Sequence, residues 1–170
     1  GSAVLFEQFM GGDGADLFDV NDADVNVSVD GAGSTNDRLR VNYDNPTQWA
    51  IGDAVESVAV QGRGVVTFNN IALAEGSDSA SDTFNLNGAA SSLRELSGRG
   101  GDDVFAVVAT SEVRMTIDGG GHTDGDKLVG ANRANNWLFA LSADDDANTL
   151  NWNSAEGAGI DFSNIEDFTG

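Results

Sequence analysis

Two segments of the chain, residues 6–18 and 93–105, align without a gap at a separation of 87 residues. Both have the pattern apolar-x-x-apolar-x-Gly-x-x-Gly-x-Asp-x-Phe. Shorter matches follow at offsets of 88 to 94 residues: 29–33 with 117–121, 37–39 with 126–128, 49–51 with 137–139 and 68–71 with 162–165. Such repetition is typical of folds that stack one unit on the next. We therefore expect a single stacked domain over residues 1–170, with an internal duplication of 3–92 and 93–170.

A shorter period lies within each copy. An Asp-x-apolar element recurs at Asp16, Asp37, Asp82, Asp103 and Asp126, in steps of 21, 45, 21 and 23 residues. If the step of 45 is two units, the unit is 21–23 residues long, which is in the range of solenoid repeats. This spacing predicts about seven or eight coils.

The residue composition favours β-strands over helices. The chain has 22 glycines and one proline, and its short apolar runs alternate with polar residues, as in 25–29 and 113–117. Alternation over a few residues between turn-forming clusters indicates half-buried strands. We therefore predict an all-β fold, a parallel β-helix (β-solenoid) with right-handed coils. Five apolar residues should be buried and stacked along one axis: Phe18, Leu39, Phe84, Phe105 and Leu128.

The net charge narrows the range of partners. The 28 acidic and 8 basic residues give a charge of −20. Binding to nucleic acid or to an anionic membrane needs a basic surface, so neither partner is expected. No apolar run approaches the 18 residues of a membrane-spanning helix, which argues against membrane insertion. The chain has no cysteine, which fits an exported bacterial protein. Gly1-Ser2 looks like the remnant of a tag, and we expect the natural protein to continue in both directions.

Two resemblances follow from these motifs. Residues 11–19 fit the nonapeptide G-G-x-G-x-D-x-U-x of RTX calcium-binding repeats. The wider order, from Asp118-Gly119-Gly120-Gly121 to the segment 162–170, resembles tandem β-helical repeats of large bacterial surface and secreted proteins, of the filamentous-haemagglutinin and giant-adhesin type. The resemblance implies a repeat module of an adhesin-like protein that is extracellular or on the bacterial cell surface.

The RTX resemblance also implies a calcium site. Its ligands would be the carboxylate of Asp16 and the turn that contains Gly12 and Gly14, with Asp103 and Asp126 as further candidates. However, Ca²⁺ takes six to eight oxygens, and the complete nonapeptide occurs once. In the second copy Arg99 replaces a glycine of the motif, and the step is 21–23 residues rather than the 18 of two nonapeptides. The alternative is that the repeated aspartates cap corners by accepting backbone N–H groups.

Three functions are compatible with these features. The first is a non-catalytic stalk, filament or adhesin module, whose partners would be neighbouring repeats, a second copy stacked head to tail, or carbohydrate and other cell-surface ligands. The second is an RTX-like calcium-binding module that folds on export. The third is a carbohydrate-active β-helix of the polysaccharide-lyase kind. We favour the first, because the lone histidine, His122, lies in a Gly/Asp turn typical of a solvated loop, and because no catalytic motif stands out.

Overall fold

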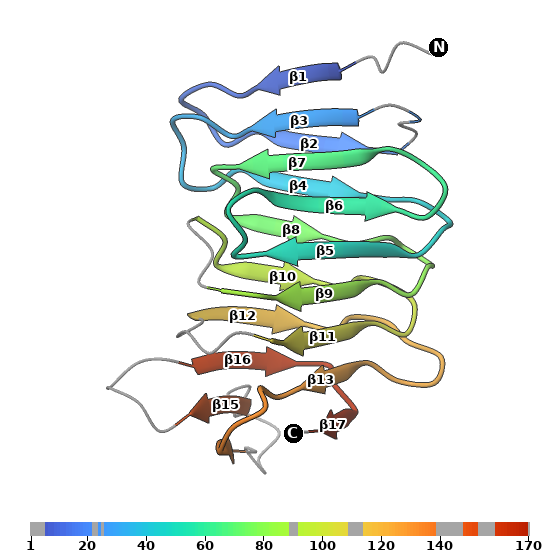
Figure 1. Cartoon of the computed structure of the whole chain (residues 1–170), viewed down its shortest axis with the longest axis vertical. Helices are drawn as coiled ribbons and strands as arrows, with labels where there is room; N and C mark the ends of the chain where they lie inside the picture. Colours follow the sequence, from blue (N-terminus) through green and yellow to red (C-terminus); the bar gives the residue numbers. More distant parts are fainter. Residues whose placement is uncertain are drawn as a thin grey trace.

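The computed structural model describes residues 6–21, 24, 26–88, 92–108, 114–138, 148–152 and 159–169. Its strands form two sheets that lie against each other along one long axis (Figure 1). Sheet A contains, in spatial order, β1 (Phe6–Met10), β3 (Asn26–Asp30), β7 (Val65–Asn69), β6 (Glu56–Val60), β5 (Thr47–Ile51), β9 (Thr83–Leu86), β11 (Val104–Val107), β13 (Lys127–Val129) and β17 (Asp167–Thr169). Sheet B contains β14 (Asn135–Leu138), β15 (Asn148–Trp152), β16 (Gly159–Ser163), β12 (Arg114–Asp118), β10 (Glu95–Ser97), β8 (Leu73–Glu75), β4 (Arg38–Val41) and β2 (Leu17–Val20).

The prediction of an all-β fold is confirmed, but the parallel β-helix of seven or eight coils is wrong. The structure consists of two mostly parallel sheets rather than a closed solenoid. Each sheet also contains an antiparallel triplet, β5–β6–β7 in sheet A and β14–β15–β16 in sheet B. These triplets lengthen the step between paired strands from 21 residues at Thr83↔Val104 to 35 at Arg38↔Leu73 and 45 at Arg114↔Gly159. A chain of 170 residues is therefore too short for the predicted number of coils.

The strands form where apolar and polar residues alternate. In β12, Met115 and Ile117 are buried while Arg114 and Thr116 face solvent, and β3 buries Val27 and Val29 in the same way. Successive side chains of a strand point to opposite faces, so this pattern places one apolar row between the sheets. Residues 25 and 113, which the predicted strands included, lie outside the described residues. The described part of the chain contains no helix that is long and apolar enough to cross a bilayer.

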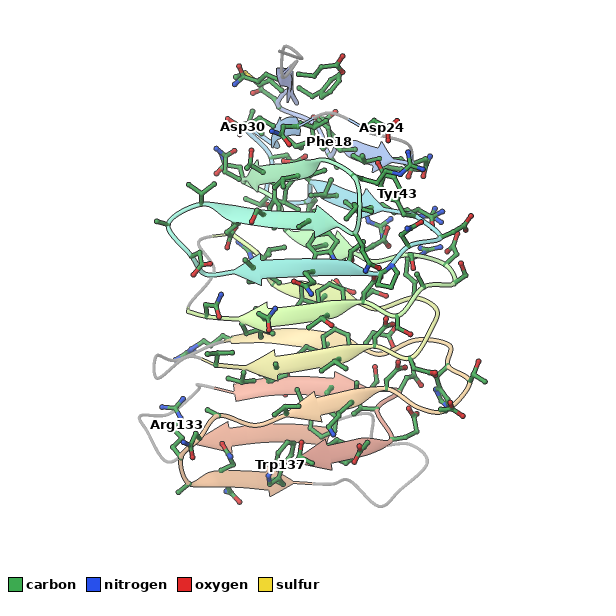
Figure 2. The ribbon with its side chains drawn as sticks, turned by 45° about the vertical axis from the view of Figure 1, so that its right-hand side comes forward. Phe18, Asp24, Asp30, Tyr43, Arg133 and Trp137 are labelled. Carbon is green, nitrogen blue, oxygen red and sulfur yellow. The ribbon has the colours of Figure 1, made fainter. Side chains whose placement is uncertain are left out.

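The core consists of two parallel ladders of side chains rather than the single predicted stack. The sheet A ladder runs through Trp49, Phe84, Phe105, Leu128 and Phe168, which are successive partners in the strand register. The sheet B ladder runs through Phe18, Leu39, Ala74, Leu96, Ile117 and Phe162. Four of the five residues predicted to be buried are fully enclosed: Leu39, Phe84, Phe105 and Leu128. Phe18 is only partly buried because it lies near one end of the stack, and Trp137 lies near the other end (Figure 2).

Equivalent strands of the two sequence copies lie in opposite sheets. In the alignment, β1 to β8 correspond to β10 to β17, so that β3 of sheet A matches β12 of sheet B, and β4 of sheet B matches β13 of sheet A. The antiparallel triplets correspond in the same manner. Outside the antiparallel triplets the chain alternates between the sheets, and β1 lies in sheet A whereas β10, its counterpart, lies in sheet B. The second copy therefore starts in the other sheet. The two copies are thus related by an approximate half-turn about the long axis.

Candidate functional site: a column of buried aspartates

A column of carboxylates lies where the chain passes from sheet B into sheet A, on the right of Figure 1. Asp82, Asp103 and Asp126 directly precede β9, β11 and β13, and all three are buried. The Oδ1 atom of Asp82 accepts the Thr47 N–H (2.9 Å), and that of Asp103 accepts the Asp82 N–H (2.7 Å). Asp126 Oδ1 accepts the Asp103 N–H (2.7 Å), and Glu166 Oε2 accepts the Asp126 N–H (2.8 Å). Each carboxylate therefore binds the backbone of the preceding rung.

A shorter column lies where the chain passes from sheet A into sheet B. There Asp37 Oδ1 accepts the Asp16 N–H (2.9 Å), and Asp16 Oδ2 accepts the Gly12 N–H (2.8 Å). With Asp82, Asp103 and Asp126, all five repeated aspartates accept backbone N–H groups at corners. The alternative that the sequence analysis left open, corner capping, is confirmed for these residues. A hydrogen bond of this kind satisfies a donor that a strand corner would otherwise leave unpaired.

A glycine faces each carboxylate and explains the Gly and Asp spacing of the motif. A β-carbon built on Gly98 would lie 2.1 Å from Asp103 Oδ2 and 2.5 Å from the carbonyl oxygen of Gly119. Gly76 and Gly119 face Asp82 Oδ2 and Asp126 Oδ2 in the same way, at 2.3 and 2.6 Å. The glycines thus leave the space that the carboxylates occupy.

Burial raises the pKa of the column carboxyls. Desolvation is the largest cause for Asp82, Asp103 and Asp126, because a buried carboxylate loses its hydration. The pKa of Asp103 rises to about 8; the charges of Asp82, Asp126 and Asp102 add to the increase, and the hydrogen bond from Asp82 N–H opposes it. Asp103 is thus a neutral carboxylic acid over much of the ordinary pH range.

This shift predicts that the protein becomes less stable as the pH rises. The folded chain keeps the Asp103 proton up to about pH 8, whereas the unfolded chain releases it near 3.8, so unfolding releases a proton between these values. Asp103→Asn replaces the titratable carboxyl group by an amide, whose oxygen can still accept the hydrogen bond from the Asp82 N–H. With chelator present, urea unfolding at pH 5, 7 and 9 should show the wild type losing free energy of unfolding relative to the variant. Parallel pH profiles for the two proteins would contradict this expectation.

The residues proposed as calcium ligands do not form one group. Gly12, Gly14 and Asp16 lie in the turn between β1 and β2, near one end of the stack, whereas Asp103 and Asp126 lie at the opposite corner on neighbouring rungs (Figure 1). The structure joins Asp103 to Asp126 through the hydrogen bond of 2.7 Å. At Asp16, the Gly12 N–H donates a hydrogen bond to the carboxylate (2.8 Å). Calcium binding at Asp16 stays a prediction.

A group of three side chains at the end of the column was not predicted from the sequence. His122 Nδ1 lies 3.2 Å from Glu166 Oε2 and 3.7 Å from Asp126 Oδ2. The three ligand atoms lie within 4.8 Å of one another. The signal was present in the alignment of the copies, because His122 and Glu166 stand where the first copy has Ser34 and Ala72. The turn that precedes Asp126 therefore places a histidine beside two carboxylates.

The turn that carries His122 is held by a second aspartate. Asp102 Oδ1 accepts the N–H groups of Thr123 (2.8 Å), Asp124 (2.8 Å) and Gly125 (3.2 Å). The bonds from Asp124, Thr123 and Gly125 lower the pKa of the Asp102 carboxyl, because they stabilise its charged form. Asp102 thus remains an anion while its neighbour Asp103 is neutral, and it fixes the path of the turn.

No family model, curated protein or solved structure matches the chain. A function must therefore be inferred from its own residues. They offer two features: a buried column that ties the rungs together, and one cluster in which an imidazole meets two carboxylates.

Proposed function

We propose that the chain is a non-catalytic structural module that stacks end to end with copies of itself or with similar repeats, as a stalk, filament or adhesin segment of a large exported bacterial protein. One observation carries the proposal. In sheet B the two sequence copies are joined by the parallel pair β8–β10, while β9–β11 joins them in sheet A. The counterparts of β8 and β10, which are β17 and β1, are the terminal strands of sheet A. An edge strand offers unpaired N–H and C=O groups to a further strand.

The burial of equivalent residues supports this reading. Leu96, on β10, is fully buried at the internal junction, whereas its counterpart Phe9, on β1, is 47% exposed. Met10 and Leu17, near the same end, are 67% and 59% exposed. At the other end Phe168 continues the sheet A ladder from Leu128. An apolar edge at one end thus matches an apolar ladder at the other, and a second copy would bury both.

The internal junction also predicts the register of this contact. Within the chain, Glu95, Leu96 and Ser97 pair with Leu73, Ala74 and Glu75. The equivalent pairs between two molecules are Gln8↔Asp167, Phe9↔Phe168 and Met10↔Thr169. Because two copies complete a full turn, sheet A continues as sheet A. The nine strands of sheet A, at a spacing of about 4.8 Å, then give an advance of about 43 Å per molecule.

Electrostatics makes the contact between molecules weaker than the junction within the chain. At the junction, Arg99 pairs with Asp78 (2.7 Å) and Glu75 (3.6 Å), which tie the second copy to the first. The counterparts of Arg99 and Glu75 at the free ends are Gly12 and Thr169, so this ion pair has no equivalent there. A net charge of −20 also opposes association at low ionic strength. We therefore expect a weak contact that salt strengthens.

Cysteine cross-linking tests the register, because the chain has no cysteine of its own. Gln8→Cys mixed with Asp167→Cys should give a disulfide-linked dimer at high protein concentration and moderate salt. Neither variant alone should do so, because a head-to-tail contact joins two different ends. The control pair is Gln8→Cys with Asn136→Cys, which lies on β14, a terminal strand of sheet B. A disulfide between these two would require β1 of one molecule to stack on sheet B of the other, so this pair should stay unlinked.

Sedimentation velocity tests the apolar contribution. Phe9→Asp should abolish the rise in sedimentation coefficient with concentration, whereas Val55→Asp, at a 62% exposed position in the turn between β5 and β6, should leave it unchanged. A wild-type protein that stays monomeric across concentration and salt, with no mixed disulfide, would reject the proposal.

A further inference from the structure

We propose that His122, Asp126 and Glu166 form a binding site for a divalent transition-metal ion of the Zn²⁺ class. This inference goes beyond the stacking function, and each can hold without the other. The three residues come from the turns that precede β13 and β17, which are paired neighbours in sheet A. The strand pairing therefore places their ligand atoms side by side.

The distances suit a tetrahedral ion. Zn²⁺ binds imidazole nitrogen and carboxylate oxygen at about 2.0–2.2 Å, which sets ligand atoms about 3.4 Å apart. His122 Nδ1 lies 3.2 Å from Glu166 Oε2 and 3.7 Å from Asp126 Oδ2. His122 and Glu166 have side chains that are 34% and 39% exposed, so an ion can enter and a water can complete the coordination.

The second observation is a buried oxygen that lacks a hydrogen bond. The Asp126 side chain is fully buried, and within the described residues its Oδ2 accepts no hydrogen bond. A buried polar atom left without a hydrogen bond destabilises the folded state, and coordination of a cation would remove that cost. Asp37 and Asp103 also have an unpaired Oδ2, but in the described part of the chain neither belongs to a group of three possible ligands.

Comparison of the two copies separates this cluster from the corner capping. In the first copy, Asp37 has the position of Asp126 and binds the backbone in the same manner, but Ser34 and Ala72 stand in place of His122 and Glu166. The hydrogen bond from the preceding aspartate N–H to Asp37 or Asp126 Oδ1 therefore needs neither side chain, although Glu166 Oε2 also accepts the Asp126 N–H. The second copy carries both His122 and Glu166, and their ligand atoms lie beside the Asp126 carboxylate. Gly125 has a φ of +129°, and a β-carbon built on it would lie 3.3 Å from Glu166 Cβ. A glycine at this position therefore leaves room for the glutamate.

The chemistry of the donors selects the metal. Imidazole nitrogen favours zinc, nickel and copper over calcium, which prefers six to eight oxygens. His122 is the only histidine of the chain, so its signals report on one position. The proposed ion thus differs from the calcium that the RTX resemblance implied, and its ligands include Asp126 but not Asp16.

The test is calorimetric titration of the chelator-treated protein with Zn²⁺ at pH 7.5 and moderate salt. One saturable site per chain is expected, together with a shift of the single His122 ring resonances. His122→Ser and Glu166→Ala install the residues of the first copy and should weaken binding by about 100-fold or more, since even an outer-shell partner contributes about 10–100-fold. Circular dichroism will show that both variants fold, as the first copy does with these residues.

Asp124→Asn is the matched control, because it removes an exposed acid from the same turn outside the cluster. It should bind Zn²⁺ as the wild type does, and a large excess of Ca²⁺ should leave binding unchanged. Weak binding at many sites, equal in all variants, would mean attraction to the overall charge and would overturn the proposal. Displacement of Zn²⁺ by equal Ca²⁺ would overturn it as well, since it would indicate an oxygen-only site.

Discussion

Phe105→Ala should lower the free energy of unfolding by about 3–5 kcal/mol, the range for removal of a buried aromatic ring. Phe105 is fully buried at the middle of the sheet A ladder, and its ring stacks on Phe84 at 4.8 Å with an interplanar angle of 8°. On its other side it pairs in register with Leu128. Backbone hydrogen bonds hold the neighbouring strands at a fixed spacing, so the cavity cannot close by collapse of the rungs. Urea unfolding followed by tryptophan fluorescence measures the loss, since Trp49 stacks on Phe84 at 5.3 Å.

The equivalent position in the other copy supplies the control. Phe18 matches Phe105 in sequence but is only partly buried near the end of the stack. Phe18→Ala should therefore cost clearly less than Phe105→Ala, because less apolar surface returns to water. Equal losses at the two positions would mean that the end of the stack is covered in solution, which would itself support association of the free ends.

The sequence was sufficient for the strand class and for the corner aspartates. Alternation as in β12 shows which residues face the core, and the recurrence of Asp before an apolar residue predicts a role at each corner. It was insufficient for the arrangement of sheets. The antiparallel triplet that begins at Trp49 depends on pairing between β5, β6 and β7, and local alternation is the same for parallel and antiparallel partners. The equal spacing that predicted regular coils fails at these triplets.

The same limit applies to the candidate site. Asp126 was found because its motif repeats, whereas His122 and Glu166 do not repeat and so carried no periodic signal. Their proximity depends on the pairing of β13 with β17, two strands separated by the long second triplet. Sequence differences between internal copies are the signal that remains. In a duplicated fold, a residue that departs from its counterpart and faces a carboxylate present in both copies is a candidate for function.

The aspartate column connects the fold to the proposed stacking role. A hydrogen bond from each rung to the next, through Asp82, Asp103 and Asp126, ties neighbouring rungs along the axis at their corner. The cost is a set of buried acids whose pKa burial raises, in a chain whose surface is already strongly acidic. In the stacking role that we propose, these hydrogen bonds would hold the module together along its length.

Gly98→Ala should destabilise the protein by about 3 kcal/mol or more, at or above the upper end of the range for overpacking. The new methyl carbon would lie 2.1 Å from Asp103 Oδ2 and 2.5 Å from the Gly119 carbonyl oxygen. Asp103 cannot move aside without losing the hydrogen bond from Asp82 N–H, and the Gly119 oxygen belongs to the backbone of the next rung. The substitution therefore forces either the column or the rung spacing to change.

Gly14→Ala is the matched control for this prediction. Gly14 belongs to the same motif in the first copy, but a β-carbon there meets nothing within 4 Å, and its φ lies outside the left-handed region. Alanine should be neutral or stabilise slightly, by up to about 1 kcal/mol, because it reduces the entropy of the unfolded chain. Thermal and urea unfolding of both variants give the comparison. If Gly98→Ala were as mild as Gly14→Ala, the carboxylate would not occupy the space opposite the glycine, and the role assigned here to the Gly and Asp of the repeat would be wrong.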